Sequence, residues 1–136
     1  MAGVAEERLR SLCAPASDFV QMIPLGFLQQ GGCPLAAYGN AGALSALFEP
    51  ENPVVPVESE AALNAHFAIC AMAPGLLDLL ANGAEWLSAR TGDPSRAEFF
   101  TTQLMAGFLS EMEKGTAGRL NAERDALATP NTLSLQ

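Results

Sequence analysis

The segment from Glu58 to Leu80 is the most apolar and most regularly patterned part of this 136-residue chain, and it constrains the fold more than any other. Its apolar residues recur at the spacing of one helix face. Pro74 interrupts the pattern, because proline lacks a backbone N–H and disfavours helical geometry in the residue before it. The sequence therefore predicts one helix that ends at Ala73 and a second that begins at Pro74.

Helices are also expected on both sides of this segment. Asp93-Pro94 predicts a helix start, since Asp caps the first turn and proline fits the first helical position. Gly92 and Gly115 are typical of helix ends. A short or kinked helix is expected over 17–30. Apolar periodicity predicts further helices over residues 2–13, 94–113 and 116–127.

Residues 35–48 allow two interpretations. Gly39-Asn40-Ala41-Gly42 is rich in residues that tolerate positive φ, which favours a tight β-hairpin. Alanine and leucine favour helix, so a helix from Ala41 to Phe48 is the alternative. The following residues, 49–57, contain three prolines and predict an extended connector.

These patterns predict a mainly α fold: a small bundle of four or five helices with a short β-hairpin near residues 35–48. We expect residues 1–128 to form one globular domain and residues 129–136 a flexible tail. No run approaches the roughly 20 apolar residues that span a bilayer. The N-terminus lacks the order of a signal peptide. The expectation is a cytoplasmic protein with no membrane contact.

Charge is distributed unevenly along the chain, whose formal net charge is −8. Residues 11–89 contain seven acidic residues and no basic one. This argues against direct nucleic-acid binding, which needs positive charge against phosphate, and favours a protein partner with a basic surface. The alternative is that the acidity only maintains solubility. The candidate partner-binding residues cluster around the connector: Glu49, Glu51, Glu58 and Glu60.

No catalytic, cofactor-binding or metal-binding set emerges from the sequence. His66 is the only histidine, and Cys70 lies one helical turn away, so a Cys-His pair is conceivable on geometry alone. A working pair needs a third group that orients the histidine, and none is apparent. Cys13, Cys33 and Cys70 lack the paired spacing of zinc ligands and fit reduced thiols. The sequence therefore favours a non-enzymatic protein without cofactors.

Asn64-Ala65 and Ala71-Met-Ala-Pro-Gly-Leu-Leu77 resemble the "NA…AAAPDLL" helix of small bacteriophage and prophage accessory proteins. Tyr38-Gly-Asn-Ala-Gly42 is similar to the Tyr-x-x-x-Gly hairpin upstream of that helix. The resemblance covers about residues 36–80. Gly75 stands where an acidic residue is typical. The resemblance implies a mobile-element origin and assigns no functional residue.

The leading hypothesis is an acidic protein-binding protein of phage origin, an inhibitor of a host defence or nucleic-acid-handling protein in the manner of anti-CRISPR proteins. The alternative is a helical adaptor or assembly chaperone, with an apolar groove between the helix after Pro74 and the helix that ends near Glu113. A small enzyme using His66 and Cys70 is the third hypothesis. The apolar content is also compatible with a homodimer.

Overall fold

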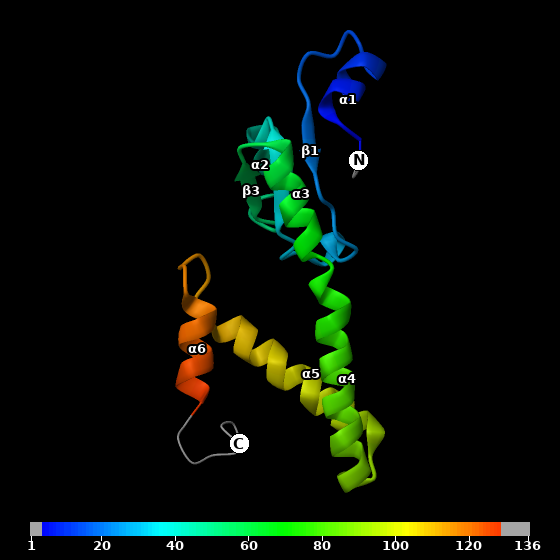
Figure 1. Ribbon diagram of the computed structural model, residues 1–136, viewed down its shortest axis with the longest axis vertical. Coiled ribbons are helices and arrows are strands. Elements are labelled where there is room, and N and C mark those ends of the chain that lie inside the picture. The colour runs from blue at the N-terminus through cyan, green and yellow to red at the C-terminus, as the bar shows by residue number, and fades with distance from the viewer. Residues whose placement is uncertain (1–3, 129–136) are drawn as a thin grey trace. The chain divides into compact units, whose positions relative to one another are not determined.

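The computed structural model describes residues 4–128 and is mainly α-helical with a small three-stranded sheet (Figure 1), which confirms the predicted fold class. The elements in chain order are α1 (Glu6–Leu12), β1 (Val20–Met22), the 3₁₀ helix η1 (Leu28–Gln30), β2 (Leu35–Gly39), α2 (Ala41–Phe48), β3 (Val54–Val57), α3 (Glu60–Ile69), α4 (Met72–Thr91), α5 (Pro94–Glu111) and α6 (Arg119–Leu127).

The chain divides into two compact units, unit 1 up to Ala73 and unit 2 from Pro74. Unit 1 contains the sheet with α1, α2 and α3, and unit 2 contains nearly all of α4 together with α5 and α6. The single domain expected over residues 1–128 stays a prediction. The tail expected over residues 129–136 lies outside the described residues.

The sheet of unit 1 has the strand order β1-β2-β3. β1 pairs antiparallel with β2, with Val20 opposite Gly39. β3 pairs parallel with β2, with Leu35 opposite Val54. Parallel neighbours need a crossover connection, and α2 with its flanking loops supplies it.

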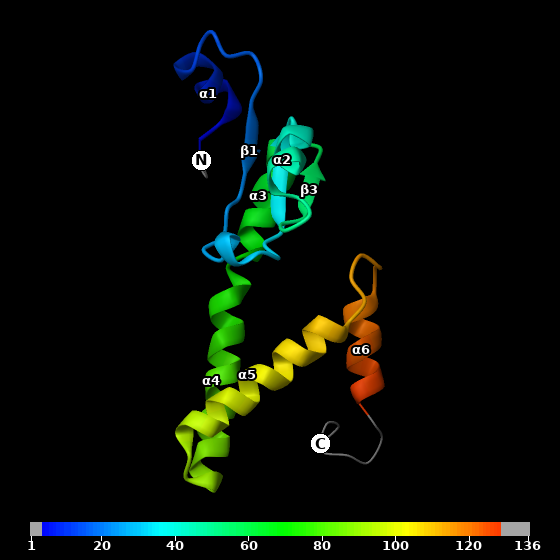
Figure 2. The same cartoon turned by 180° about the vertical axis from the view of Figure 1, so that it is seen from behind.

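The core of unit 1 lies on both faces of β2. Ala36 packs with Ile23 and with Leu63 of α3. Leu35 and Ala37 point to the opposite face, because side chains alternate along a strand, and they are 0% and 1% exposed. α2 contacts all three strands and covers this second face, and the two views show α2 and α3 on opposite sides of the sheet (Figures 1 and 2).

Two local features hold the ends of β2. The backbone N–H of buried Cys33 donates to Asn52 Oδ1 at 2.9 Å, which ties the start of β2 to the loop before β3. At the other end Gly39 has φ +100°, and a Cβ there would lie 2.3 Å from the carbonyl oxygen of Phe19. Only glycine fits so close a backbone approach at this φ.

The predicted hairpin over residues 35–48 is wrong in its second arm, and the alternative helix is confirmed as α2. Asn40 caps this helix, since its side chain accepts from the N–H of Ala43 at 3.3 Å. Asn is common both in tight turns and at helix N-caps. Because the alanines and leucines after Asn40 favour helix, the segment forms α2 and not a second strand. The first arm, β2, pairs with two strands that are distant from it in sequence.

The predicted helix over residues 17–30 is also wrong. Its apolar residues lie in β1, in a loop and in the single turn η1. Pro24 and Gly26 disfavour a helix here. The backbone groups along one edge of the buried strand β2 need hydrogen-bond partners, and β1 supplies them. The pairing of Gln21 with Tyr38 is a long-range contact that local periodicity does not reveal.

The break between the two central helices comes earlier than predicted. α3 ends at Ile69 and α4 begins at Met72, so Pro74 lies inside the first turn of α4. The N–H groups of a first turn have no intrahelical acceptor, so a proline there costs no hydrogen bond. The predicted start of α5 is confirmed: Asp93 caps it by accepting from Arg96 N at 3.0 Å, and Pro94 is its first residue.

Asn52 should be a main stabilising residue of unit 1. Asn52→Ala leaves the buried N–H of Cys33 without its acceptor, which should lower the free energy of unfolding by about 1–3 kcal/mol. Urea denaturation followed by circular dichroism measures this. Asn64→Ala, at an exposed position of α3, is the control and should change stability by less than about 0.5 kcal/mol. Equal effects of the two substitutions would contradict the assignment.

Candidate functional site

The predicted acidic cluster is split by β3. Glu49 and Glu51 precede this strand and Glu58 and Glu60 follow it, so the two pairs are separated by the strand's length, about 13 Å. Glu51 and Glu58 are exposed. The other two have partners inside unit 1: Glu49 Oε1 accepts from Val54 N at 3.1 Å, and Glu60 Oε1 accepts from Gln21 Nε2 at 3.3 Å.

β3 is the edge strand of the sheet on this side. Pro53 faces β2, because its carbonyl accepts from Leu35 N at 2.9 Å. Alternation along the strand then turns the backbone groups of positions 54 and 56 toward the open edge. The N–H of Val54 is bonded to Glu49, and Pro56 has no N–H. Glu49 therefore has a structural role at the sheet edge.

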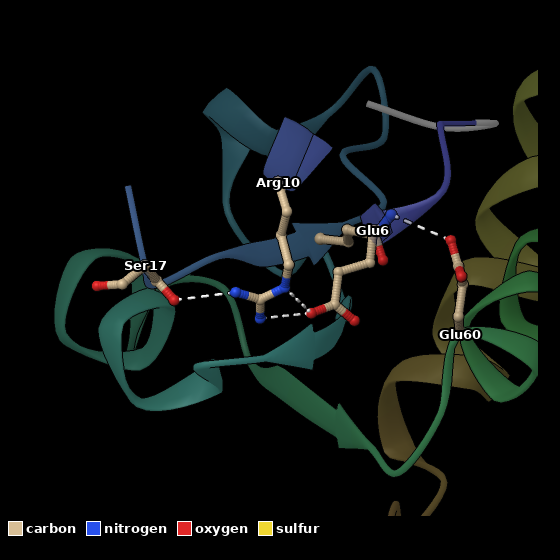
Figure 3. A network of polar contacts seen from close by, with 5 residues as sticks. Glu6, Arg10, Ser17 and Glu60 are labelled. Atoms are coloured by element: carbon tan, nitrogen blue, oxygen red, sulfur yellow. Dashed lines mark hydrogen bonds and ion pairs between the residues drawn. The ribbon is translucent and has the colours of Figure 1, made fainter. Parts of the chain in front are cut away.

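A polar network joins α1 to the segment that follows it (Figure 3). Arg10 Nε donates to Glu6 Oε1 at 2.7 Å, and Arg10 Nη1 donates to the carbonyl oxygen of Ser17 at 3.0 Å. The Arg10 guanidinium also lies over the ring of Phe19, 5.1 Å from its centre. These contacts hold α1 against the chain leading into β1.

Gln21 is a buried polar residue that the sequence did not single out as a candidate. It is 5% exposed, and its Nε2 donates to the carbonyl of Val4 at 2.6 Å as well as to Glu60. Its Oε1 is buried and has no hydrogen-bond partner among the described residues. A polar residue in a short apolar run gives no sequence signal that it will be buried.

Glu6 influences two ionisable groups. Its hydrogen bond from Arg10 holds the pKa of the Glu6 carboxyl below its ordinary value. The negative charge of Glu6 raises the pKa of Tyr38 above 10.0, and a hydrogen bond between the two side chains adds to this. Both effects favour an ionised Glu6 beside a neutral Tyr38.

His66 and Cys70 line the same small apolar pocket of about 100 Å³ in unit 1. Each is bonded along its own helix: His66 Nδ1 to the carbonyl of Ala62 at 2.8 Å, and the Cys70 thiol to the carbonyl of His66 at 3.5 Å. Among the residues that the structure describes, no carboxylate lines this pocket. Within residues 4–128, no group of three or more His, Cys, Asp and Glu residues is placed to hold a metal ion.

One helical segment, Glu60–Thr91, is long and apolar enough to cross a membrane by length and composition. Most of this segment is exposed in the structure. Length and composition alone do not identify a span. Leu63, near the start of the segment, packs in the core of unit 1.

Unit 2 exposes most of its large apolar side chains. Among its described residues, only Ala84 and Ala97 are buried. Nine large apolar residues, on α5 and on the part of α4 that belongs to unit 2, are between 41% and 67% exposed. We call these residues the α4–α5 apolar surface: Leu76, Leu77, Leu79, Trp86, Phe99, Phe100, Leu104, Phe108 and Leu109.

The two helices of this surface touch over a narrow region. The Thr101 methyl lies 3.7 Å from where a Cβ on Gly83 would sit, and the small residues Ala84 and Ala97 are buried. An open groove of about 550 Å³ lies between the helices, with Leu77 and Leu80 among its lining residues. α5 then diverges from α4 (Figure 2). Large apolar side chains of both helices are exposed.

Comparison of the chain with protein-family models, with curated proteins and with solved structures finds no match.

Tyr38 is the only tyrosine, so its titration can be followed by tyrosinate absorbance. The midpoint should lie above 10.0, and Glu6→Gln should move it back toward that value. The neutral phenol is favoured in the fold, so this contribution to stability is present below pH 10 and is lost as pH rises through the raised pKa. Glu7→Gln, an exposed neighbour, should leave the midpoint unchanged. A midpoint insensitive to Glu6→Gln would refute the coupling.

Proposed function

We propose that this protein works by binding other proteins rather than by catalysis, and that the α4–α5 apolar surface is its contact surface. The supporting observation is the exposure of nine large apolar side chains on two neighbouring helices. Monomeric soluble proteins rarely expose contiguous apolar patches beyond a few hundred Å², and larger ones mark interaction sites. This is the adaptor or chaperone hypothesis in its general form.

The aromatic residues of this surface leave a substantial apolar area open. An aromatic side chain buries roughly 150–250 Å², so a half-exposed one leaves about 100 Å² open. This surface has four aromatic residues, which together leave about 400 Å² open: Trp86, Phe99, Phe100 and Phe108. A groove beside Leu77 and Leu80 adds a concave element that a partner side chain could enter.

The enzymatic hypothesis has less support. His66 and Cys70 share a pocket, but the His66 Nδ1 position is occupied by a backbone carbonyl. A nucleophilic pair requires a hydrogen bond between thiol and imidazole, and the Cys70 thiol is directed to the carbonyl of His66.

The acidity of residues 11–89 favours a second candidate, in which a basic protein is the partner. Glu51 and Glu58 are exposed at the two ends of edge strand β3 and are the residues we propose for this contact. A cytoplasmic host defence or nucleic-acid-handling protein has the required positive surface, and the phage resemblance makes an inhibitor of such a protein the specific form of this proposal. Complementary charge would mainly accelerate association.

A photo-crosslinking amino acid at position 100 tests the contact surface in cells that express the full chain. Phe100 is 59% exposed on α5, so the probe fits there. We expect covalent protein adducts from position 100. The same probe at Leu47, which is 76% exposed on α2, is the control and should give few. If position 100 gives no more adducts than position 47, this surface is not a protein contact.

The acidic candidate has its own test. Glu51→Gln combined with Glu58→Gln should slow association with a basic partner identified from the adducts, and raised salt should slow the unmodified protein similarly. Stopped-flow measurement of the association rate shows this. Glu7→Gln with Glu123→Gln removes the same net charge elsewhere and should have a smaller effect. If the two double substitutions have equal effects, Glu51 and Glu58 act only through the net charge of the protein and its solubility, and not through a specific contact.

A further inference from the structure

We propose that the groove between α4 and α5 binds an apolar peptide segment of a partner protein, and that this segment carries a lysine or arginine side chain. This inference rests on the proposed function and names the chemistry of the segment that the contact surface takes. It follows from the apolar walls of the groove, from two carboxylates at those walls, and from the nearby arginines, which contact other groups.

The walls of the groove are mainly apolar. Its volume of about 550 Å³ lies within the roughly 300–1,000 Å³ of clefts that bind ligands. Both helices contribute apolar residues to it: Leu77, Leu80, Ala81, Ala84 and Ala89 from α4, and Pro94 from α5. The alanines are small and leave room for a side chain from another molecule. Leu77 also belongs to the α4–α5 apolar surface, so a segment that enters the groove can continue over that surface.

Two carboxylates lie at this groove, those of Glu85 on α4 and Glu98 on α5. Both residues are exposed. Within residues 4–128, neither carboxylate accepts a hydrogen bond or forms an ion pair. The other polar residues that line the groove, Ser88 and Thr102, are neutral, and the Thr102 hydroxyl donates to the backbone carbonyl of Glu98 at 2.9 Å. The two carboxylates can therefore accept hydrogen bonds from a cationic group of a bound molecule.

The nearby arginines contact other groups. Arg96 Nε lies 3.2 Å from Asp93 Oδ2. The Arg90 guanidinium lies over the Trp86 ring, 3.8 Å from its centre, and its Nη1 donates to the carbonyl of Trp86 at 3.1 Å. Among the described residues, no basic side chain lines the groove. Residues 77–102 contain four acidic residues and two basic ones, a formal net charge of −2, so the surroundings of the groove have the same sign as its carboxylates.

An apolar segment with a basic side chain complements both the walls and the carboxylates. Apolar side chains of the segment displace water from the walls, which is favourable. A lysine or arginine can lay its aliphatic stem along the apolar residues while its charged head reaches Glu85 or Glu98. A segment without a cation would cover these carboxylates and remove their hydration without replacing it. The phosphate groups of a nucleic acid or a lipid would be repelled by them.

Selection from a displayed library of random peptides against the purified full chain tests the inference. We expect the enriched peptides to combine apolar residues with lysine or arginine. In fluorescence anisotropy, a synthetic copy of an enriched peptide should bind about fivefold more tightly than the same peptide with its basic residue replaced by glutamine, as two exposed ion pairs would give. Enrichment of peptides that contain only apolar residues overturns the inference.

Removal of the two carboxylates tests their role. Glu85→Gln combined with Glu98→Gln should abolish the fivefold preference for the basic peptide, because both ion-pair partners are lost. Glu7→Gln combined with Glu111→Gln removes the same net charge from exposed positions outside the groove and should keep the preference. A preference that survives the first double substitution, or that is lost equally in the second, overturns the assignment.

A filled groove tests the place of binding. Ala81→Trp occupies the space between the helices from an exposed position and should weaken peptide binding about tenfold. Ala46→Trp, at an exposed position of α2, is the matched control and should leave binding unchanged. Circular dichroism checks that each variant keeps its helix content. Equal binding by the two tryptophan variants places the peptide outside the groove and overturns the inference.

Failure of this inference is distinguishable from failure of the proposed function. If no basic peptide is enriched but position 100 still forms adducts with other proteins, the chemistry of the groove is overturned and the contact surface stands. If neither is observed, both are overturned. A dimer in sedimentation equilibrium that Ala81→Trp converts to monomers assigns the groove to a second copy. Flotation with phosphatidylcholine vesicles that Ala81→Trp abolishes assigns it to a membrane, and either result overturns the peptide assignment.

Discussion

Hydrogen bonding along both edges of β2 is the constraint on which unit 1 depends. Leu35 and Ala37 are withdrawn from water, so the backbone groups of this strand need protein partners. β1 supplies them on one edge and β3 on the other. The parallel pairing with β3 in turn requires a crossover, which places α2 on the sheet and brings Asn52 to Cys33. Most of the architecture of unit 1 therefore follows from the need to pair the backbone groups of one buried strand, β2.

Unit 2 is built on a different principle. Its helices satisfy their own backbone groups, so they need no pairing with a neighbouring strand. The small residues Gly83, Ala84 and Ala97 mark the place where α4 and α5 approach one another. Small side chains allow a close contact but bury little apolar area. The larger side chains remain outside that contact, so the burial that would stabilise these helices and the proposed contact with a partner depend on the same residues.

The elements that could be predicted from the sequence are those decided locally. The start of α5 follows from Asp93 and Pro94, and its apolar row follows from helical spacing. β1 was missed because Gln21 and its neighbours become a strand only through pairing with β2. Periodicity predicted a helix over 94–113 but does not tell a buried face from an exposed one, and Phe100, Leu104 and Phe108 are exposed. The clustering of acidic residues in the sequence also could not show that Glu49 and Glu60 accept hydrogen bonds from other residues of unit 1.

The bonding of Glu49 to Val54, together with Pro56, has a consequence for how copies of this chain can associate. An edge strand normally offers N–H groups to any extended segment that passes, which is the route to strand addition and fibre growth. On the open side of β3 one N–H is already bonded and the next is missing. The sheet therefore ends at β3, and this edge does not recruit a further strand from another molecule.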